Sequence, residues 1–251
     1  MLLLRANNAS PWTGPTGNNT YLLTGVVPAL IDAGVGDGSH LDAIAAALGG
    51  VPLARVLITH GHPDHVGGLP SLLARWPSAR VIRFGQSIDD RIEAGDTALR
   101  AVHTPGHSPD HLSFFDEKSH DLYCGDLVRA AGSIVIPASK GGNLRQYLAS
   151  LANVRALRPR RLLPGHGPII DDPEAIIDAY VKHRTEREEQ IIAALRAGFM
   201  TPEEITAAVY GELSPALTAA AADSVLAHLV KLHDENRAFV SDDGWRLQEF
   251  C

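Results

Sequence analysis

The sequence predicts an α/β (α+β) layered protein with a second, small helical domain at its C-terminal end. Short apolar runs bounded by Gly, Pro, Asn or Asp alternate with stretches of helical spacing, and the pattern becomes mostly helical after Asp172. Strands that alternate with helices are typical of a core in which helices cover a sheet. The 251 residues suffice for one large domain or for a large domain with a small partner.

The elements of the core follow in order along the chain. The apolar runs predict strands at 2–5, 21–24, 29–32, 55–59, 80–84, 112–115, 121–124 and 161–163. Helical spacing predicts helices at 40–48, 68–76 and 144–157, between these strands. This order favours a layered α/β core.

Beyond Asp172 the pattern predicts three helices and a hairpin. Pro173 opens a helix to about Ala197, and Thr201 followed by Pro202 is typical of an N-cap and first helical position. A third helix is expected at 217–235, and 238–240 and 245–247 flank an Asp-Gly turn. Three helices and a hairpin indicate a winged-helix-like domain, so we divide the chain into 1–172 and 173–251.

Composition excludes several classes of protein. Hydrophobic residues make up 45% and charged residues 20%, which is ordinary globular composition and not that of a disordered chain. No apolar run reaches the roughly 20 residues that span a bilayer, and the apolar start is too short for a signal peptide. Two cysteines make no disulfide framework. We therefore expect a cytoplasmic protein that does not bind membranes.

A histidine-rich loop directly follows the strand expected at 55–59. It carries His60, His62, Asp64 and His65 within six positions. His60 and His62 can reach one ion, whereas Asp64 and His65, beyond the turn at Pro63, can face a second. Imidazole and carboxylate suit Zn²⁺ and, with less selectivity, Mn²⁺ or Fe²⁺. The alternative is a histidine-rich surface loop that caps a helix beginning near Val66.

Three further motifs place a potential ligand next to a glycine and beside an expected strand. They are Thr-Pro-Gly-His107, Cys-Gly-Asp126 and Pro-Gly-His166-Gly. Glycine at these positions permits tight turns and close backbone approach. Their recurrence favours a metal site over a chance cluster.

With these motifs the chain resembles the metallo-β-lactamase-fold superfamily. The resemblance implies a four-layer αββα sandwich with the metal site at the edge where strand-end loops meet. It implies that two Zn²⁺ ions are bound, one by His60, His62 and His107, and the other by Asp64, His65 and His166, with Asp126 as the bridge. Together with its C-terminal extension, the chain is similar to the β-lactamase-like protein 2 group.

Such a site implies hydrolysis. A water shared by two cations loses its proton near neutral pH, and the resulting hydroxide attacks a carbonyl or phosphorus atom. We expect Asp126 and Asp64 to be the catalytic carboxylates, with Asp64 orienting the nucleophile and accepting its proton. The sequence contains no Gly-x-Ser-x-Gly motif that would indicate a serine nucleophile.

Several other residues are candidates beside the metal site. Trp12 lies in an irregular loop and can stack on a substrate or pack on the loop's own base. Lys140 and Arg145 surround an expected helix start that can receive an anion, although a plain turn is the alternative. His111 can orient a metal ligand, as can His103. Cys124 is expected to be a small buried hydrophobe rather than a ligand.

The charge of the C-terminal extension reduces the number of plausible substrate classes. From residue 178 to the end there are seven basic and thirteen acidic residues, which accounts for most of the net charge of −7. A helix that reads nucleic acid needs more positive charge, so the extension is expected to cap the site or to form a homodimer contact. The leading hypothesis is hydrolysis of a small ester or thioester, and the resemblance keeps a single-strand endoribonuclease as the alternative. β-Lactam or lactone hydrolysis and a metal-sensing winged-helix regulator are weaker alternatives.

Overall fold

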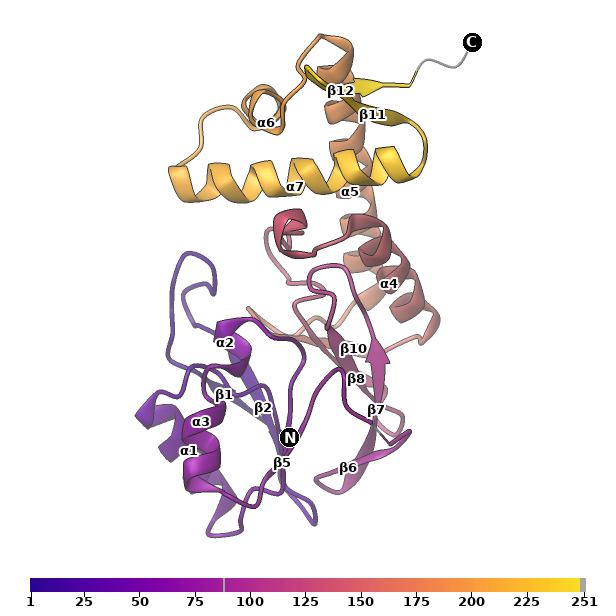
Figure 1. Ribbon diagram of the computed structural model, residues 1–251. Helices are drawn as coiled ribbons and strands as arrows, with labels where there is room; N and C mark the ends of the chain where they lie inside the picture. Colours follow the sequence, from indigo (N-terminus) through magenta and orange to yellow (C-terminus); the bar gives the residue numbers. More distant parts are fainter. Residues whose placement is uncertain (88, 249–251) are drawn as a thin grey trace.

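Two five-stranded mixed sheets form the core of the N-terminal part, and the C-terminal helices lie above them in the view of Figure 1. The computed structural model describes residues 1–87 and 89–248. The first sheet has the order β1-β2-β3-β4-β5, with β1 (Leu2–Arg5), β2 (Asn19–Leu23), β3 (Ala29–Ile31), β4 (Arg55–Leu57) and β5 (Arg80–Ile82). The second has the order β10-β9-β8-β7-β6, with β6 (Ile92–Ala94), β7 (Thr97–His103), β8 (Leu112–Asp116), β9 (Asp121–Gly125) and β10 (Arg161–Pro164).

Alternation along the strands produces the layers. In β2, Tyr21 and Leu23 pack between the two sheets with residues such as Phe114 of β8. Leu22, which points the other way, packs with Ile44 in a separate cluster. This cluster joins the first sheet to α1 (Gly38–Leu48) and α3 (Leu69–Arg75). Residues 21–23 of β2 are all apolar because both faces of the strand are buried there.

The fourth layer covers the outer face of the second sheet. Leu122 and Leu162 of that sheet pack with Tyr147 and Leu151 of α4 (Leu144–Ala156) and with Ile177 of α5 (Pro173–Arg196). Asn143 caps the start of helix α4, and its side chain accepts a hydrogen bond from the backbone of the first turn. The expected αββα arrangement is confirmed.

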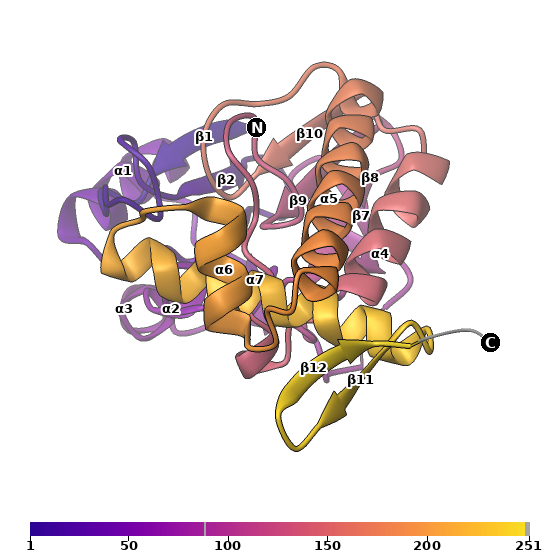
Figure 2. The same cartoon turned by 90° about the horizontal axis from the view of Figure 1, so that it is seen from above.

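The C-terminal region has the expected three helices and hairpin. Helices α5, α6 (Pro202–Tyr210) and α7 (Pro215–Asp234) are followed by the antiparallel pair β11 (Ala238–Ser241) and β12 (Gly244–Leu247). Thr201 caps α6, and Glu204 completes a capping box. Seen from above, α6 and α7 lie across the central layers (Figure 2).

Two local features differ from the sequence prediction. Strands β6 and β7 form a hairpin around Gly95 and Asp96 that was not expected, because charged residues interrupt the alternation there. The predicted turn after His62 is a short helix, α2 (Pro63–Val66), so Asp64 and His65 lie on a helix rather than beyond a turn. Proline is well suited to a first helical position, and it starts this helix one residue after His62.

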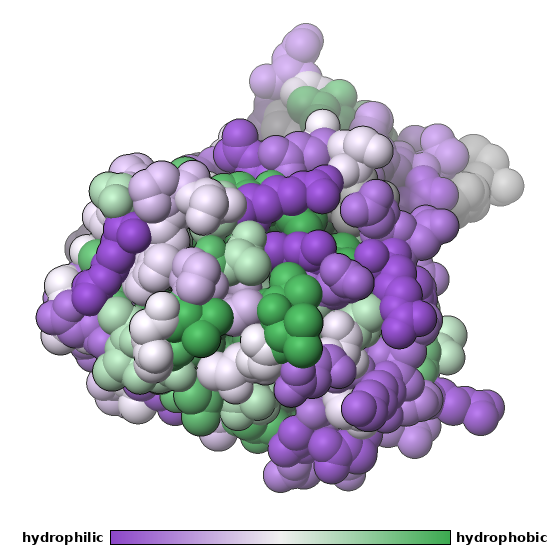
Figure 3. All heavy atoms as spheres, turned by 90° about the horizontal axis from the view of Figure 1, so that it is seen from below, coloured by the Kyte–Doolittle hydropathy of each residue, from purple (hydrophilic) through white to green (hydrophobic). Residues whose placement is uncertain are grey.

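Among the helices of residues 1–87 and 89–248, none combines the length and apolar character needed to cross a bilayer. On the face seen from below, hydrophobic side chains form small groups separated by polar ones (Figure 3). Apolar groups of this size are normal on a protein surface.

Candidate metal centre

All seven potential ligands meet at one edge of the sandwich, and both sheets contribute. The first sheet supplies the histidine-rich loop and helix α2, which follow β4; the second supplies the residues that follow β7, β9 and β10. Three groups have ligand atoms within 4.8 Å of one another: His60, His62 and His107; His60, His65 and Asp126; and Asp64, His65 and His166. Residues more than 100 positions apart are thus brought together because their strands end at the same edge.

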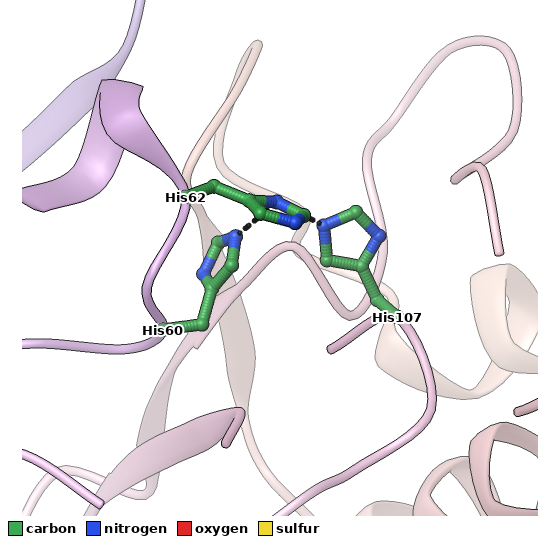
Figure 4. A group of neighbouring side chains, drawn as sticks. All are labelled: His60, His62 and His107. Carbon is green, nitrogen blue, oxygen red and sulfur yellow. Dashed lines mark hydrogen bonds between the residues drawn. The ribbon is translucent and has the colours of Figure 1, made fainter. Parts of the chain in front are cut away.

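The first group consists of three histidine rings that face one another (Figure 4). The Nδ1 atom of His62 lies 3.0 Å from Nε2 of His60 and 2.9 Å from Nε2 of His107. The Nδ1 atom of His107 lies 2.7 Å from the carbonyl oxygen of Val135. Because a carbonyl can only accept, Nδ1 of His107 carries the proton and Nε2 keeps its lone pair for a metal.

The second group lies beside the first, with Asp126 between them. Asp126 Oδ1 is 3.3 Å from His166 Nε2 and 3.4 Å from His65 Nε2, while Oδ2 is 3.6 Å from His107 Nε2. Asp64 Oδ2 is 3.4 Å from His166 Nε2. The two carboxyl oxygens of Asp126 therefore face different groups of ligands.

Asp32 holds His65 in place from behind. Its Oδ2 lies 2.7 Å from Nδ1 of His65, and Oδ1 accepts hydrogen bonds from the backbone N–H and the hydroxyl of Thr59 at 2.8 and 3.0 Å. Asp32 and His65 are both buried. The contact directs Nε2 of His65 toward Asp64 and Asp126, because the Asp32 carboxylate accepts a hydrogen bond from Nδ1–H.

Close packing at the second group depends on a glycine. A Cβ atom at Gly165 would lie 2.6 Å from Cε1 of His65 and 2.8 Å from Oδ1 of Asp126. Any larger residue would push these two side chains apart. The glycine of the motif Pro-Gly-His166 therefore allows His65 and Asp126 to lie close together, and the motif also places His166.

The protonation of the site follows from burial and neighbouring charges. Burial lowers the pKa of His60 well below its ordinary value and that of His62 to about 4. Burial also opposes charge on His166, but Asp126 and Asp64 outweigh it and raise the pKa to about 9. For Asp126, the interactions with His65 and His166 outweigh burial, so its pKa is lowered. The first group is therefore neutral at pH 7 and Asp126 is ionised.

His111 supports Asp126 from the backbone side. Its Nε2 accepts a hydrogen bond from the backbone N–H of Asp126 at 3.0 Å, and its Nδ1 lies 2.8 Å from the hydroxyl of Thr104. Burial lowers the pKa of His111 to about 3, which keeps the ring neutral and able to accept. His103 instead stacks on Phe84 at the surface, away from the ligand cluster.

A cavity of about 470 Å³ opens above the cluster. Side chains of His62, Asp64, His107, Asp126 and His166 line it. Its walls include two of the residues singled out in the sequence, Trp12 and Lys140, and three residues of helix α7; the full wall comprises Trp12, Arg129, Ser133, Ile134, Val135, Pro137, Lys140, Ala219, Ala220 and Asp223. The C-terminal region thus covers the site.

Arg145 does not reach this cavity. It is exposed on the first turn of α4, while its neighbours Leu144 and Tyr147 face the core. The backbone N–H of Ser139, in a short 3-10 helix (Ala138–Lys140) before α4, already donates to the carboxylate of Asp223 at 3.0 Å. Cys124 is fully buried in the core cluster, and burial raises the pKa of its thiol.

Several residues of the site are absent from the sequence prediction. Asp32 stands at the end of one apolar strand, and His60 stands at the end of another. This similar placement is the feature of the sequence that could have indicated Asp32. Arg129 lines the cavity and donates to the carbonyl oxygen of Trp12 at 3.3 Å. The carbonyl of Val135 and the α7 residues carry no local signal, because only the tertiary fold brings them to the site.

Comparison with known proteins identifies the family. Residues 13–83 and 78–166 match the model of the metallo-beta-lactamase superfamily, and residues 201–245 match that of the beta-lactamase associated winged helix domain. The chain belongs to the metallo-beta-lactamase superfamily. Members of this superfamily are generally hydrolases and bind metal ions.

Curated relatives match most of this superfamily member. It is 35% identical over 243 residues to the lactamase-like protein aptB of Emericella nidulans, a match that covers 88% of this chain and 77% of that protein. It is 32% identical over 247 residues to the beta-lactamase-like protein 2 homolog of Caenorhabditis elegans, with 90% and 81% covered. The similarity to the β-lactamase-like protein 2 group is confirmed.

Solved structures share the fold of this chain. A metallo-beta-lactamase family protein from Thermus thermophilus superimposes with a TM-score of 0.77 at 21% identity, covering 98% of both chains. A second protein, solved in a di-iron-bound form, has a TM-score of 0.52 at 26% identity and covers 65% of this chain and 94% of its own.

The residues of this superfamily site fit a pair of metal ions. Asp126 Oδ1 is buried and makes no hydrogen bond of ordinary geometry, although buried polar atoms are normally satisfied. The surrounding donors are imidazole nitrogens and carboxylate oxygens, which suit Zn²⁺, Mn²⁺ and Fe²⁺. A cation at this position would satisfy the carboxylate.

Proposed function

We propose that this protein is a dinuclear zinc hydrolase that cleaves a small ester or thioester. His60, His62 and His107 would hold one ion; Asp64, His65 and His166 would hold the second; and Asp126 would bridge the two. Mn²⁺ or Fe²⁺ could take the same positions. The alternative is a single-strand endoribonuclease, and β-lactam or lactone hydrolysis is a weaker one.

The observation that carries the proposal is the position of the potential metal ligands at the floor of one cavity. Its volume of about 470 Å³ falls in the range of small-molecule sites. Much of the wall is apolar or small, with Trp12 from the N-terminal loop, Ile134 from the segment that follows Asp126, and Ala219 and Ala220 from α7. A wall of this kind suits an acyl chain better than a nucleic-acid backbone, which needs a basic groove.

The protein's own residues would prepare the reaction in three ways. Bound metal ions would supply Lewis-acid chemistry by lowering the pKa of water and stabilising negative charge on the carbonyl oxygen. Ionised Asp64 lines the cavity, is fixed by the side-chain amide of Asn18 at 3.0 Å, and would orient the attacking water and accept its proton. Trp12 and the apolar wall would hold the acyl group, and Lys140 would contact a polar or charged part of the substrate.

The test is a rate assay of zinc-loaded protein on a panel of small thioesters and on a labelled single-stranded oligoribonucleotide. We expect thioester turnover in the wild type and a loss of at least about 100-fold in Asp126→Ala. Asp171→Ala removes an exposed carboxylate that lies outside the cavity and should match the wild type. RNA cleavage that disappears in Asp126→Ala, without thioester turnover, would contradict the proposal and support the endoribonuclease.

A further inference from the structure

A stretch of irregular chain joins the two halves of the metal centre. The segment 127–137 begins directly after Asp126 and contains Val135, whose carbonyl oxygen lies 2.7 Å from Nδ1 of His107. It forms no helix or strand of its own, and it supplies five residues of the cavity wall. Its conformation must therefore be fixed by side chains from elsewhere.

Helices α4 and α5 provide those side chains. The hydroxyl of Tyr147 in α4 donates to the carbonyl of Leu127 at 2.7 Å. The hydroxyl of Tyr180 in α5 accepts from the backbone N–H of Arg129 at 3.0 Å and lies 3.1 Å from its carbonyl oxygen. Both contacts lie in the first half of the segment, nearer to Asp126 than to Val135.

Arg184 of α5 holds the second half. Its guanidinium donates to the carbonyl oxygen of Ile134, the residue immediately before Val135. The side chain is only 3% exposed, and its guanidinium carbon lies 5.5 Å from the centre of the Tyr147 ring. No carboxylate among the described residues forms an ion pair with it, and its Nε has no hydrogen-bond partner.

Burial of an arginine without a carboxylate partner costs stability. Packing alone does not explain a buried arginine here, because an apolar side chain of similar volume would fill the same space with a smaller loss of stability. What an apolar residue would lack is the hydrogen bond to Ile134. The fixed position of that carbonyl in turn fixes the next one, which orients His107.

We propose that Arg184 is a positioning residue for the metal centre, through which helix α5 of the C-terminal region sets the orientation of His107. The path runs from Arg184 to the Ile134 carbonyl, along one peptide unit to the Val135 carbonyl, and from there to Nδ1 of His107. It acts on the group of His60, His62 and His107. It does not act on the group of Asp64, His65 and His166, in which Asp32 holds His65 and Asn18 holds Asp64 independently. The inference rests on the metal centre of the proposed function but not on its substrate.

The experiment is a cobalt(II) titration of metal-depleted protein, followed by visible absorption and calorimetry. Arg184→Met should weaken one of the two binding steps about tenfold, the lower end of what loss of a ligand-orienting contact costs. It should also change the absorption bands of that step, while the other step stays within about twofold of wild type. Arg184→Lys keeps a donor and should recover most of the affinity. If Arg184→Met does not fold, Arg184→Gln, which is polar but shorter, takes its place.

Arg187, one turn further along α5, provides the matched control. It lies over the ring of Tyr210 at 3.8 Å and contacts α6 rather than the segment 127–137. Arg187→Met should leave both cobalt steps unchanged. Unchanged cobalt binding in Arg184→Met, equal weakening of both steps, or the same loss in Arg187→Met would overturn the role of Arg184. A wild type that binds no cobalt would contradict the proposed metal centre itself.

Discussion

Replacing Asp32 by Asn should reverse the hydrogen bond that orients His65. Asp32 has φ 60°, a conformation that Asn tolerates well, so the backbone can stay as it is. The Asn oxygen can still accept from the backbone and hydroxyl of Thr59, where Asp32 Oδ1 accepts now at 2.8 and 3.0 Å. Its amide nitrogen then takes the place of Oδ2, which lies 2.7 Å from Nδ1 of His65.

An amide nitrogen donates and cannot accept, so Nδ1 of His65 must give up its proton. The neutral ring then keeps its remaining proton on Nε2, the atom that faces Asp64 and Asp126 at 3.6 and 3.4 Å and would bind the metal. The wrong tautomer at a ligand should cost about 100-fold in affinity for that ion, the upper end for loss of an orienting partner. The folded protein should lose about 2 kcal/mol, because one charge-assisted hydrogen bond is replaced by a neutral one.

The assay compares wild type, Asp32→Asn and Asp32→Ala by cobalt titration and by urea unfolding of the metal-depleted protein. Asp32→Ala leaves the buried donors of His65 and Thr59 without an acceptor and should be the less stable variant, with a loss of about 4 kcal/mol. Asp32→Asn should be the more stable variant but no better at binding metal. An Asp32→Asn protein with wild-type cobalt affinity would refute the tautomer argument.

Three further perturbations test other parts of the structure. Interactions with His228, Lys231 and Arg237 outweigh burial and lower the pKa of Glu188 from 4.5 to about 2. The stability that ionised Glu188 gives the folded protein is therefore complete above about pH 4.5 and is lost as the pH falls through about 2. Urea unfolding should show Glu188→Gln about 2 kcal/mol less stable at pH 7 and with a flatter acid limb; an unchanged limb would contradict this. Gly106→Ala places a Cβ 2.3–2.5 Å from Tyr147 at φ 140° and should cost about 3 kcal/mol in thermal unfolding, whereas a loss below about 1 kcal/mol would mean that α4 shifts freely. Asp223→Ala removes the acceptor of Ser139 and should speed amide hydrogen exchange in the first half of α7, and unchanged exchange would show that this contact does not hold the helix.

Most of the secondary structure could be predicted from the sequence, and the seven potential ligands named there lie together in the structure. Short strands that end in His or Asp next to Gly could be recognised because each signal lies within a few residues. The caps at Thr201 and Asn143 are equally local, since each side chain binds a backbone group three residues away. Hence the helix order and the hairpin of the C-terminal region could be predicted as well.

The supporting contacts could not be predicted in the same way. Asp32 and His65 are 33 positions apart, and Arg184 lies 50 positions from Ile134. Such contacts depend on which strands and helices become neighbours, and a single sequence contains no local pattern for that. The hairpin of β6 and β7 was missed for a different reason: its polar residues obscure the alternation that marks a half-buried strand.

Helix α5 has a consequence for how the molecule unfolds. Its first half contributes Ile177 and Tyr180 to the cluster beneath the second sheet, and its second half contributes Ile191 and Leu195 to the cluster of the C-terminal region. A helix of 24 residues propagates cooperatively, so melting one half removes support from the other. The two regions should consequently denature in a single cooperative transition. Cutting the chain just before this helix would expose the inner cluster rather than release an independent unit.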